Sequence, residues 1–354
     1  MSELESGKLD TRLRIYALLL VPGFVGHTLQ LTAEDVPWGT VARGRYFWTP
    51  GWHLMLSPWI PTILAFALIA CVLGLGITAF RNVESTRLLD IHAPRFWLAC
   101  TALAYSAHYL TYPFRIRNHM SHMLASLGGV LVVWLAVRLG SRTKPSALRV
   151  YDDAALHVLA MVACVTYFFA GLHKLNWAFL DLRLGADGAS VSGSSAVDGL
   201  ITFEVYGDLG SEPWWIERAV AAWGTVFIEM VVPIIAWRIE RLRTLAVTVL
   251  MLFHFPHVAV MDVADYPMIA CASYAAFFTR EHALSLAPSF QPSRWNVIGA
   301  ALGIATQLWF MPFWGRLTIF GLFVLALWGY AIGSFVHAQF VLPRRGQEAR
   351  LSRA

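Results

Sequence analysis

Runs of about twenty apolar residues recur along almost the whole chain. An α-helix needs ~20 such residues to cross the hydrocarbon core of a bilayer, because each residue adds ~1.5 Å. The sequence therefore predicts an all-α, polytopic membrane bundle of about ten spans. The count is eight to ten, because the eighth and ninth runs are short and could instead be half-spanning or re-entrant segments. The predicted spans are 15–31, 59–80, 96–112, 119–137, 154–175, 216–237, 245–261, 264–278, 295–310 and 317–340.

The composition excludes an ordinary water-soluble enzyme. Hydrophobic residues make up 57% of the 354 residues and charged residues only 14%, whereas soluble domains carry about 25% charged residues. No linker or internal repeat divides the chain, so we expect one transmembrane domain over 1–354. Its longest polar stretch, 176–215, is expected to be an extracytoplasmic loop, either a lid or a mobile surface loop.

The basic residues predict the orientation of the chain. With ten spans and a cytoplasmic N-terminus, 19 of the 27 lysines and arginines fall on the cytoplasmic side. This excess is typical of cytoplasmic loops, so we expect a multi-pass inner-membrane protein with both termini in the cytoplasm. The arginines cluster at the ends of apolar runs and form no continuous basic stripe. They therefore indicate a lipid bilayer as partner, and no nucleic acid.

Histidines gather at the predicted outer face, where eight of the twelve lie. Two H-x-x-H pairs, His119 with His122 and His254 with His257, have spacings that put both side chains on one side of a helix. Such pairs are compatible with a metal site, but the longer histidine boxes of zinc or di-iron enzymes are absent. We expect no bound metal, and a metal-dependent hydroxylase remains an alternative.

Lys174 is the most informative single residue. The chain uses arginine at 24 of its 27 basic positions, and a desolvated lysine, unlike arginine, can lose its proton and act as a base. Helical spacing puts Tyr167, Ala170 and Gly171 on the same face as Lys174, while His173 points about 100° away. The alternative is a snorkelling lysine that anchors the end of the helix.

Glu229 is the one carboxylate well inside a predicted span. Counting ~1.5 Å per residue from Ile216 places it near mid-membrane, well below Lys174. We therefore expect no direct pair between Lys174 and Glu229. A neutral, hydrogen-bonded glutamate and a functional one both remain open.

These residues occur in the order found in a known family. The segment 167–176 reads YFFAGLHKLN and is similar to the Y-x-x-A-G-x-x-K-L segment of vitamin K-dependent gamma-carboxylases and their bacterial relatives, the horizontally transferred transmembrane (HTTM) proteins. The N-H element resembles Asn118-His119. The F-x-E-x-x-x-P segment resembles Phe227 to Pro233, and the H…F-P segment resembles His254 with Tyr266-Pro267. The family-like core covers about 96–278.

The resemblance implies a specific chemistry. In the carboxylases the matching lysine deprotonates reduced vitamin K, which reacts with O2 to give an epoxide and a strong base, and CO2 then adds to a glutamate. It implies that Lys174 is the catalytic base and that His119 assists it at the extracytoplasmic face. Reduced quinone, O2 and CO2 would be the cofactors and co-substrates. The expected pocket residues are Asn118, Tyr167, Gly171, His173, Glu229, His254 and His257.

One departure from the family limits this implication. The carboxylases carry a large extracytoplasmic region after the membrane domain, whereas this sequence ends shortly after its last apolar run. The sequence thus predicts a membrane enzyme of quinol and oxygen-coupled epoxidation or carboxylation that acts on a quinone-like molecule and a peptide or small-molecule substrate. A non-enzymatic membrane partner or immunity-type protein of the same family is the alternative.

Overall fold

The computed structural model describes residues 7–33, 59–110, 118–140, 146–186, 190–192, 214–260, 270, 272–280, 283, 294–314, 329 and 333. This part of the chain is mostly helical, and its only β interaction is an isolated bridge between Leu184 and Ser190. The elements are α1 (Thr11–Ala33), α3 (Trp59–Arg81), α4 (Pro94–Leu110), α5 (Asn118–Gly140), α6 (Ser146–Lys174), α7 (Trp177–Leu180), α9 (Trp215–Arg238), η3 (Glu240–Leu242), α10 (Arg243–Val260), η4 (Tyr274–Phe277) and α13 (Arg294–Trp314).

The predicted apolar runs coincide with long helices. Eight of the ten runs fall on α1, α3, α4, α5, α6, α9, α10 and α13. Within the described ranges, four stretches are long and apolar enough to cross a membrane: Ile63–Arg81, His122–Gly140, Ser146–Lys174 and Trp215–Arg238. The run 317–340 lies outside the described residues except for Gly329 and Gly333. The described end of 264–278 contains the 3-10 helix η4.

Helix α3 shows why these elements suit a bilayer. Its buried residues recur at the i, i+3, i+7 spacing of one helix face: Ala65, Leu68, Val72, Leu75 and Ala79. Its other face is equally apolar and exposed: Ile63, Phe66, Leu73, Ile77 and Phe80. A helix that is hydrophobic on all sides is stable only when both faces leave water. The exposed face of α3 is therefore suited to contact with lipid.

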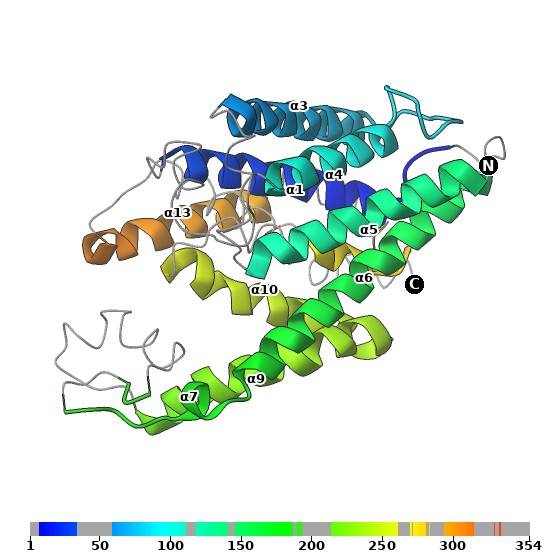
Figure 1. Ribbon diagram of the computed structural model, residues 1–354. Helices are drawn as coiled ribbons and strands as arrows, with labels where there is room; N and C mark the ends of the chain where they lie inside the picture. Colours follow the sequence, from blue (N-terminus) through cyan, green and yellow to red (C-terminus); the bar gives the residue numbers. More distant parts are fainter. Residues whose placement is uncertain are drawn as a thin grey trace, which may run out of the picture. The chain divides into compact units, whose positions relative to one another are not determined.

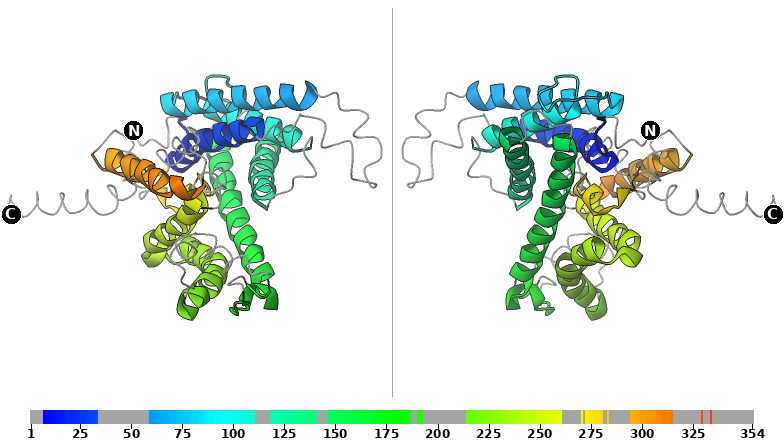
Figure 2. Two further views of the ribbon diagram at one scale, coloured as in Figure 1. Left: turned by 90° about the vertical axis from the view of Figure 1, so that its left-hand side faces the viewer. Right: turned by 90° about the vertical axis from the view of Figure 1, so that its right-hand side faces the viewer.

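The chain forms two compact units, with the boundary inside α6. Unit 1 comprises 1–162 and 268–292, and unit 2 comprises 163–267 and 293–354. In unit 1, α3 packs against α1 and α4, and α4 packs against α5 (Figure 1, Figure 2). Phe24 of α1 contacts Tyr105 of α4, with ring centroids 5.3 Å apart.

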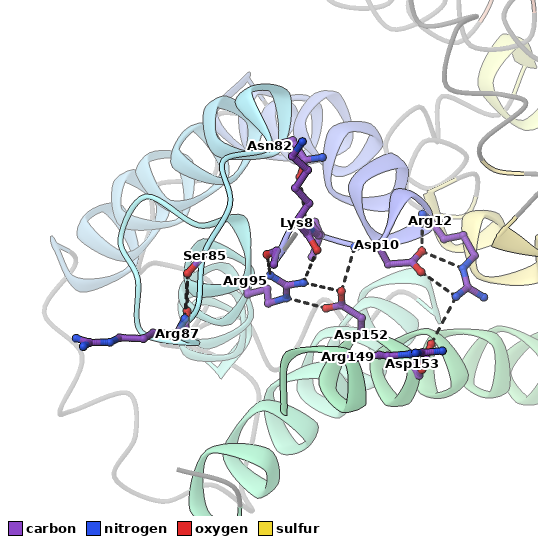
Figure 3. Close-up of polar contacts among 12 residues, drawn as sticks. Lys8, Asp10, Arg12, Asn82, Ser85, Arg87, Arg95, Arg149, Asp152 and Asp153 are labelled. Carbon is purple, nitrogen blue, oxygen red and sulfur yellow. Dashed lines mark hydrogen bonds and ion pairs between the residues drawn. The ribbon is translucent and has the colours of Figure 1, made fainter. Parts of the chain in front are cut away.

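A buried ion pair holds the N-terminal segment against the rest of unit 1. Arg95 and Asp152 have side chains only 2% and 6% exposed, and Arg95 Nη2 lies 2.7 Å from Asp152 Oδ2. Arg95 also donates to the backbone carbonyls of Gly7 (2.9 Å) and Lys8 (2.7 Å), and the backbone N–H of Asp10 donates to Asp152 at 3.0 Å (Figure 3). We call these residues, 7–10 with Arg95 and Asp152, the N-terminal clamp.

The clamp requires a particular backbone conformation at Gly7 and an ionised side chain at Asp10. Gly7 has φ +67°, and a Cβ there would overlap the carbonyl of Ser85, so the position requires glycine. Burial by itself would raise the pKa of Asp10, but the hydrogen bonds and charge of Arg12 outweigh burial and lower that pKa. Asp10 thus stays ionised within the clamp.

Unit 2 is built around the second half of α6. Helix α9 packs against α10, and α7 packs against α9. Phe179 of α7 forms a buried cluster with Ala222 and Val226 of α9. Helix α13 meets the helical residues Gly329 and Gly333 with no side chain between the backbones, since a Cβ on Gly299 would overlap the carbonyl of Gly329.

We expect Gly329→Val to disrupt this contact. The neighbouring atoms are backbone atoms of Gly299 and Ala300, which cannot rotate away, and close backbone approach at small residues is a main source of helix association in membranes. The thermal unfolding temperature in detergent should fall by several degrees, as expected for ~1–3 kcal/mol of overpacking. Gly128→Ala is the control, because nothing lies within 4 Å of a Cβ there. Equal unfolding temperatures for both variants would contradict the contact.

Candidate functional site

The candidate site lies in unit 2, where α6 and α9 approach closely. Gly171 is buried on α6, and a Cβ at this position would lie 2.5 Å from Met230 Cγ and 3.2 Å from both Glu229 Cβ and the Met230 backbone nitrogen. The absence of a side chain therefore lets α9 approach α6 at the level of Glu229. The next turn of α6 carries Lys174.

Lys174 and Glu229 form a direct ion pair. Nζ of Lys174 lies 2.8 Å from Oε1 and 2.6 Å from Oε2 of Glu229, so both carboxylate oxygens accept from the amine. The side chain of Glu229 is 9% exposed and that of Lys174 27% exposed. The carboxylate is thus buried between the helices, and the amine retains access from one side.

This pair corrects the expectation that Lys174 and Glu229 lie at different depths. The residue count assumed that α6 ends and α9 begins at the same level, but Ala222 and Val226 of α9 pack against Phe179 of α7, which follows the end of α6. Residues well along α9 therefore lie beside the last turn of α6. Burial of the pair also disfavours a lysine that only snorkels to head groups.

A second polar pair lies on the same face of α6, about two turns earlier. The hydroxyl of Tyr167 and Nε2 of His254 on α10 are hydrogen-bonded to each other, and both residues are about 1% exposed. Their rings are 5.8 Å apart between centroids. One turn before Tyr167, Cys164 Sγ donates to the carbonyl of Pro233 at 3.5 Å. The α6 face that contacts α9 and α10 is therefore polar at three levels.

Asn176 and Phe179, which follow Lys174 in the chain, complete the site. The sequence predicted a role for neither residue. Asn176 accepts from the Phe179 backbone N–H at 2.9 Å and donates to the His173 carbonyl at 2.7 Å, so it caps α7 and closes the end of α6. The Phe179 ring centroid lies 6.0 Å from Lys174 Nζ, within the range of a cation–π contact. The signal for α7 was weak because the helix has only four residues.

Of the other predicted site residues, only His173 has a side chain in the described part of the chain, and that side chain is exposed. Asn118 and His119 begin α5 and His257 lies in α10, but their side chains are outside the described part of the chain, so their proximity to Lys174 stays a prediction. His122, described in unit 1, is buried and lies 3.4 Å from Ser273 Oγ through Nε2. Among the described residues, no three His, Cys, Asp or Glu side chains converge on one point as a metal site requires.

We expect Gly171→Leu to separate α6 from α9. The Met230 side chain can move, but the Met230 backbone and Glu229 Cβ cannot yield enough for a leucine. The unfolding free energy should fall by ~1–3 kcal/mol, as for other overpacking substitutions, and any Lys174-dependent activity should fall with it. Gly224→Ala is the matched control on α9, because the nearest atom to its Cβ is Val220 Cγ1 at 3.8 Å. Wild-type stability in Gly171→Leu would exclude the close approach.

Comparison with known proteins adds no family assignment. No protein family matches the chain, and no curated protein or solved structure is significantly similar to it. The resemblance to the vitamin K-dependent gamma-carboxylases therefore depends on the quoted motifs and their order.

Proposed function

We propose that the chain is an integral membrane enzyme of quinol and oxygen-coupled chemistry, related to the membrane domain of the vitamin K-dependent gamma-carboxylases. Lys174 acts as the base that deprotonates a reduced quinone. Reaction with O2 then leads to epoxidation or carboxylation-type chemistry, with CO2 as co-substrate in the latter case. His257, on the same helix as His254, is proposed to line the pocket around Lys174.

The observation that carries this proposal is the ion pair between Lys174 and Glu229. A lysine that served only as a membrane anchor would contact head groups or solvent. Lys174 is instead bound by a carboxylate that is 9% exposed, between helices that meet at Gly171. Ionisable side chains inside membrane-spanning helices are rare and usually mark functional sites. The Tyr167–His254 pair adds a second buried group able to donate and accept protons.

We propose ten spans in the inner membrane, cytoplasmic termini and an active site toward the extracytoplasmic face. The uneven distribution of basic residues supports this orientation. Reporter fusions that follow Arg14 and Arg344 are expected to show cytoplasmic activity. Periplasmic activity of either fusion would overturn the topology.

The direct test of the substrate class is a search for bound quinone. The protein would be purified in a mild detergent with native lipid, and the extract analysed by mass spectrometry. We expect a quinone at a level near one per protein, and oxygen-dependent consumption of added quinol. Absence of both would reject the quinol chemistry and favour a non-enzymatic membrane partner.

A further inference from the structure

The geometry of the Lys174–Glu229 pair permits proton transfer without rearrangement. Both oxygens of Glu229 lie within hydrogen-bond distance of Nζ, at 2.8 and 2.6 Å, so an N–H bond of the amine already points at its acceptor. Such contacts are among the short, charge-assisted hydrogen bonds. The two groups are thus placed to share one proton.

The surroundings of the two groups differ in a way that assigns them different roles. Glu229 lies on the side of the pair that faces the contact between α6 and α9, where Gly171 and Met230 bring the two backbones together. Lys174 is three times as exposed and has the Phe179 ring on another side. A substrate approaching the open side therefore meets the amine, while the carboxylate lies behind it.

A buried carboxylate is a suitable proton store when its partner becomes neutral. Charge in an apolar environment is unfavourable unless it is paired, so a glutamate beside a neutral amine is more stable as the acid. Pro233 lacks an N–H, so the Glu229 backbone carbonyl has no intrahelical donor at that position.

We propose that Glu229 is the proton partner of Lys174, which accepts the ammonium proton to generate the free amine. This inference rests on the proposed function. In the step, the N–H bond of the ammonium breaks and an O–H bond forms on Glu229, so an ammonium and a carboxylate become an amine and a carboxylic acid with no change in net charge. The amine then takes a hydroxyl proton from the quinol, leaving an oxyanion beside the restored ammonium.

The test compares Glu229→Gln and Glu229→Asp with the exposed control Glu240→Gln. Glutamine keeps the size and a hydrogen-bond acceptor but cannot take the proton. We expect Glu229→Gln to lose at least ~100-fold in quinol turnover, while bound quinone and membrane expression persist. Partial activity in Glu229→Asp would show rescue by a shorter carboxylate. Full turnover in Glu229→Gln would overturn the proposal and leave a Lys174-dependent quinol reaction standing.

A second measurement needs no substrate and separates this inference from the proposed function. Infrared spectra would be recorded at neutral pH for Lys174→Met and for Lys174→Met/Glu229→Gln. We expect a protonated carboxyl band in the single variant that is absent from the double variant, because Glu229 without its cation would hold a proton. No such band would mean that Glu229 cannot store the proton. Failure of the proposed function alone would appear as absent quinone with the band still present.

Discussion

Lys174→Arg is expected to lower quinol turnover by at least ~100-fold, a loss as large as that in Lys174→Ala. Arginine keeps the positive charge and can bind the Glu229 carboxylate at two points, so the ion pair and the fold should persist. Its guanidinium does not release a proton under these conditions, so the base is lost. The measurement is oxygen-dependent turnover of a quinol by purified protein, normalised to membrane expression.

Lys8→Arg is the matched control for this substitution. Lys8 also contacts a glutamate, Glu84 at 3.6 Å, but both side chains are well exposed, at 41% and 61%. Exposed pairs of this kind contribute little to stability, so Lys8→Arg should behave as wild type. Normal turnover in Lys174→Arg would exclude proton abstraction by the lysine and restore the membrane-anchor interpretation.

Asp152→Ala is expected to produce the largest loss of stability, about 3–5 kcal/mol. The substitution removes the buried carboxylate that accepts two hydrogen bonds from Arg95, at 2.8 and 2.7 Å, and leaves the guanidinium without its counter-charge. Breaking a buried ion pair from one side is strongly destabilising for this reason. Circular dichroism during thermal unfolding in detergent measures the effect.

The double variant Arg95→Met/Asp152→Ala separates charge from packing. Removing both charges eliminates the unpaired cation, so the double variant should recover part of the stability lost in Asp152→Ala. Recovery will be incomplete, because the Gly7 and Lys8 carbonyls also lose their donor (Figure 3). Asp153→Ala, at an adjacent residue that is 60% exposed, should have little effect. Equal losses in the Asp152 and Asp153 variants would contradict the clamp.

The sequence predicted the helices well because hydrophobic length is a local property. The predicted span 59–80 and helix α3 (Trp59–Arg81) agree within one residue, since both depend on one uninterrupted apolar run. The ends were less accurate where polar turns extend a helix, as at Ser146, eight residues before the predicted start at Ala154. Charged residues in the first turns of α6, such as Asp152, interrupt the apolar pattern, so the predicted span began after them.

Contacts between helices were not predictable in the same way. The face of α6 that carries Tyr167, Gly171 and Lys174 followed from helical spacing, but the partner of Lys174 depends on how far α9 extends past α6. Arg95 entered the sequence argument only as a charge that indicates orientation, and nothing local pointed to Asp152, 57 residues away. The contact of Gly299 with Gly329 likewise depends on tertiary packing.

The length of α6 has a consequence for the lipid that surrounds the protein. Its 29 residues would extend ~44 Å, but the apolar stretch between the acidic pair Asp152-Asp153 and His173 corresponds to only ~28 Å, close to the thickness of a typical hydrocarbon core. Short-chain lipids would therefore expose this stretch or force the helix to tilt. Turnover in reconstituted vesicles should accordingly depend on acyl-chain length, with an optimum where bilayer thickness matches this one helix.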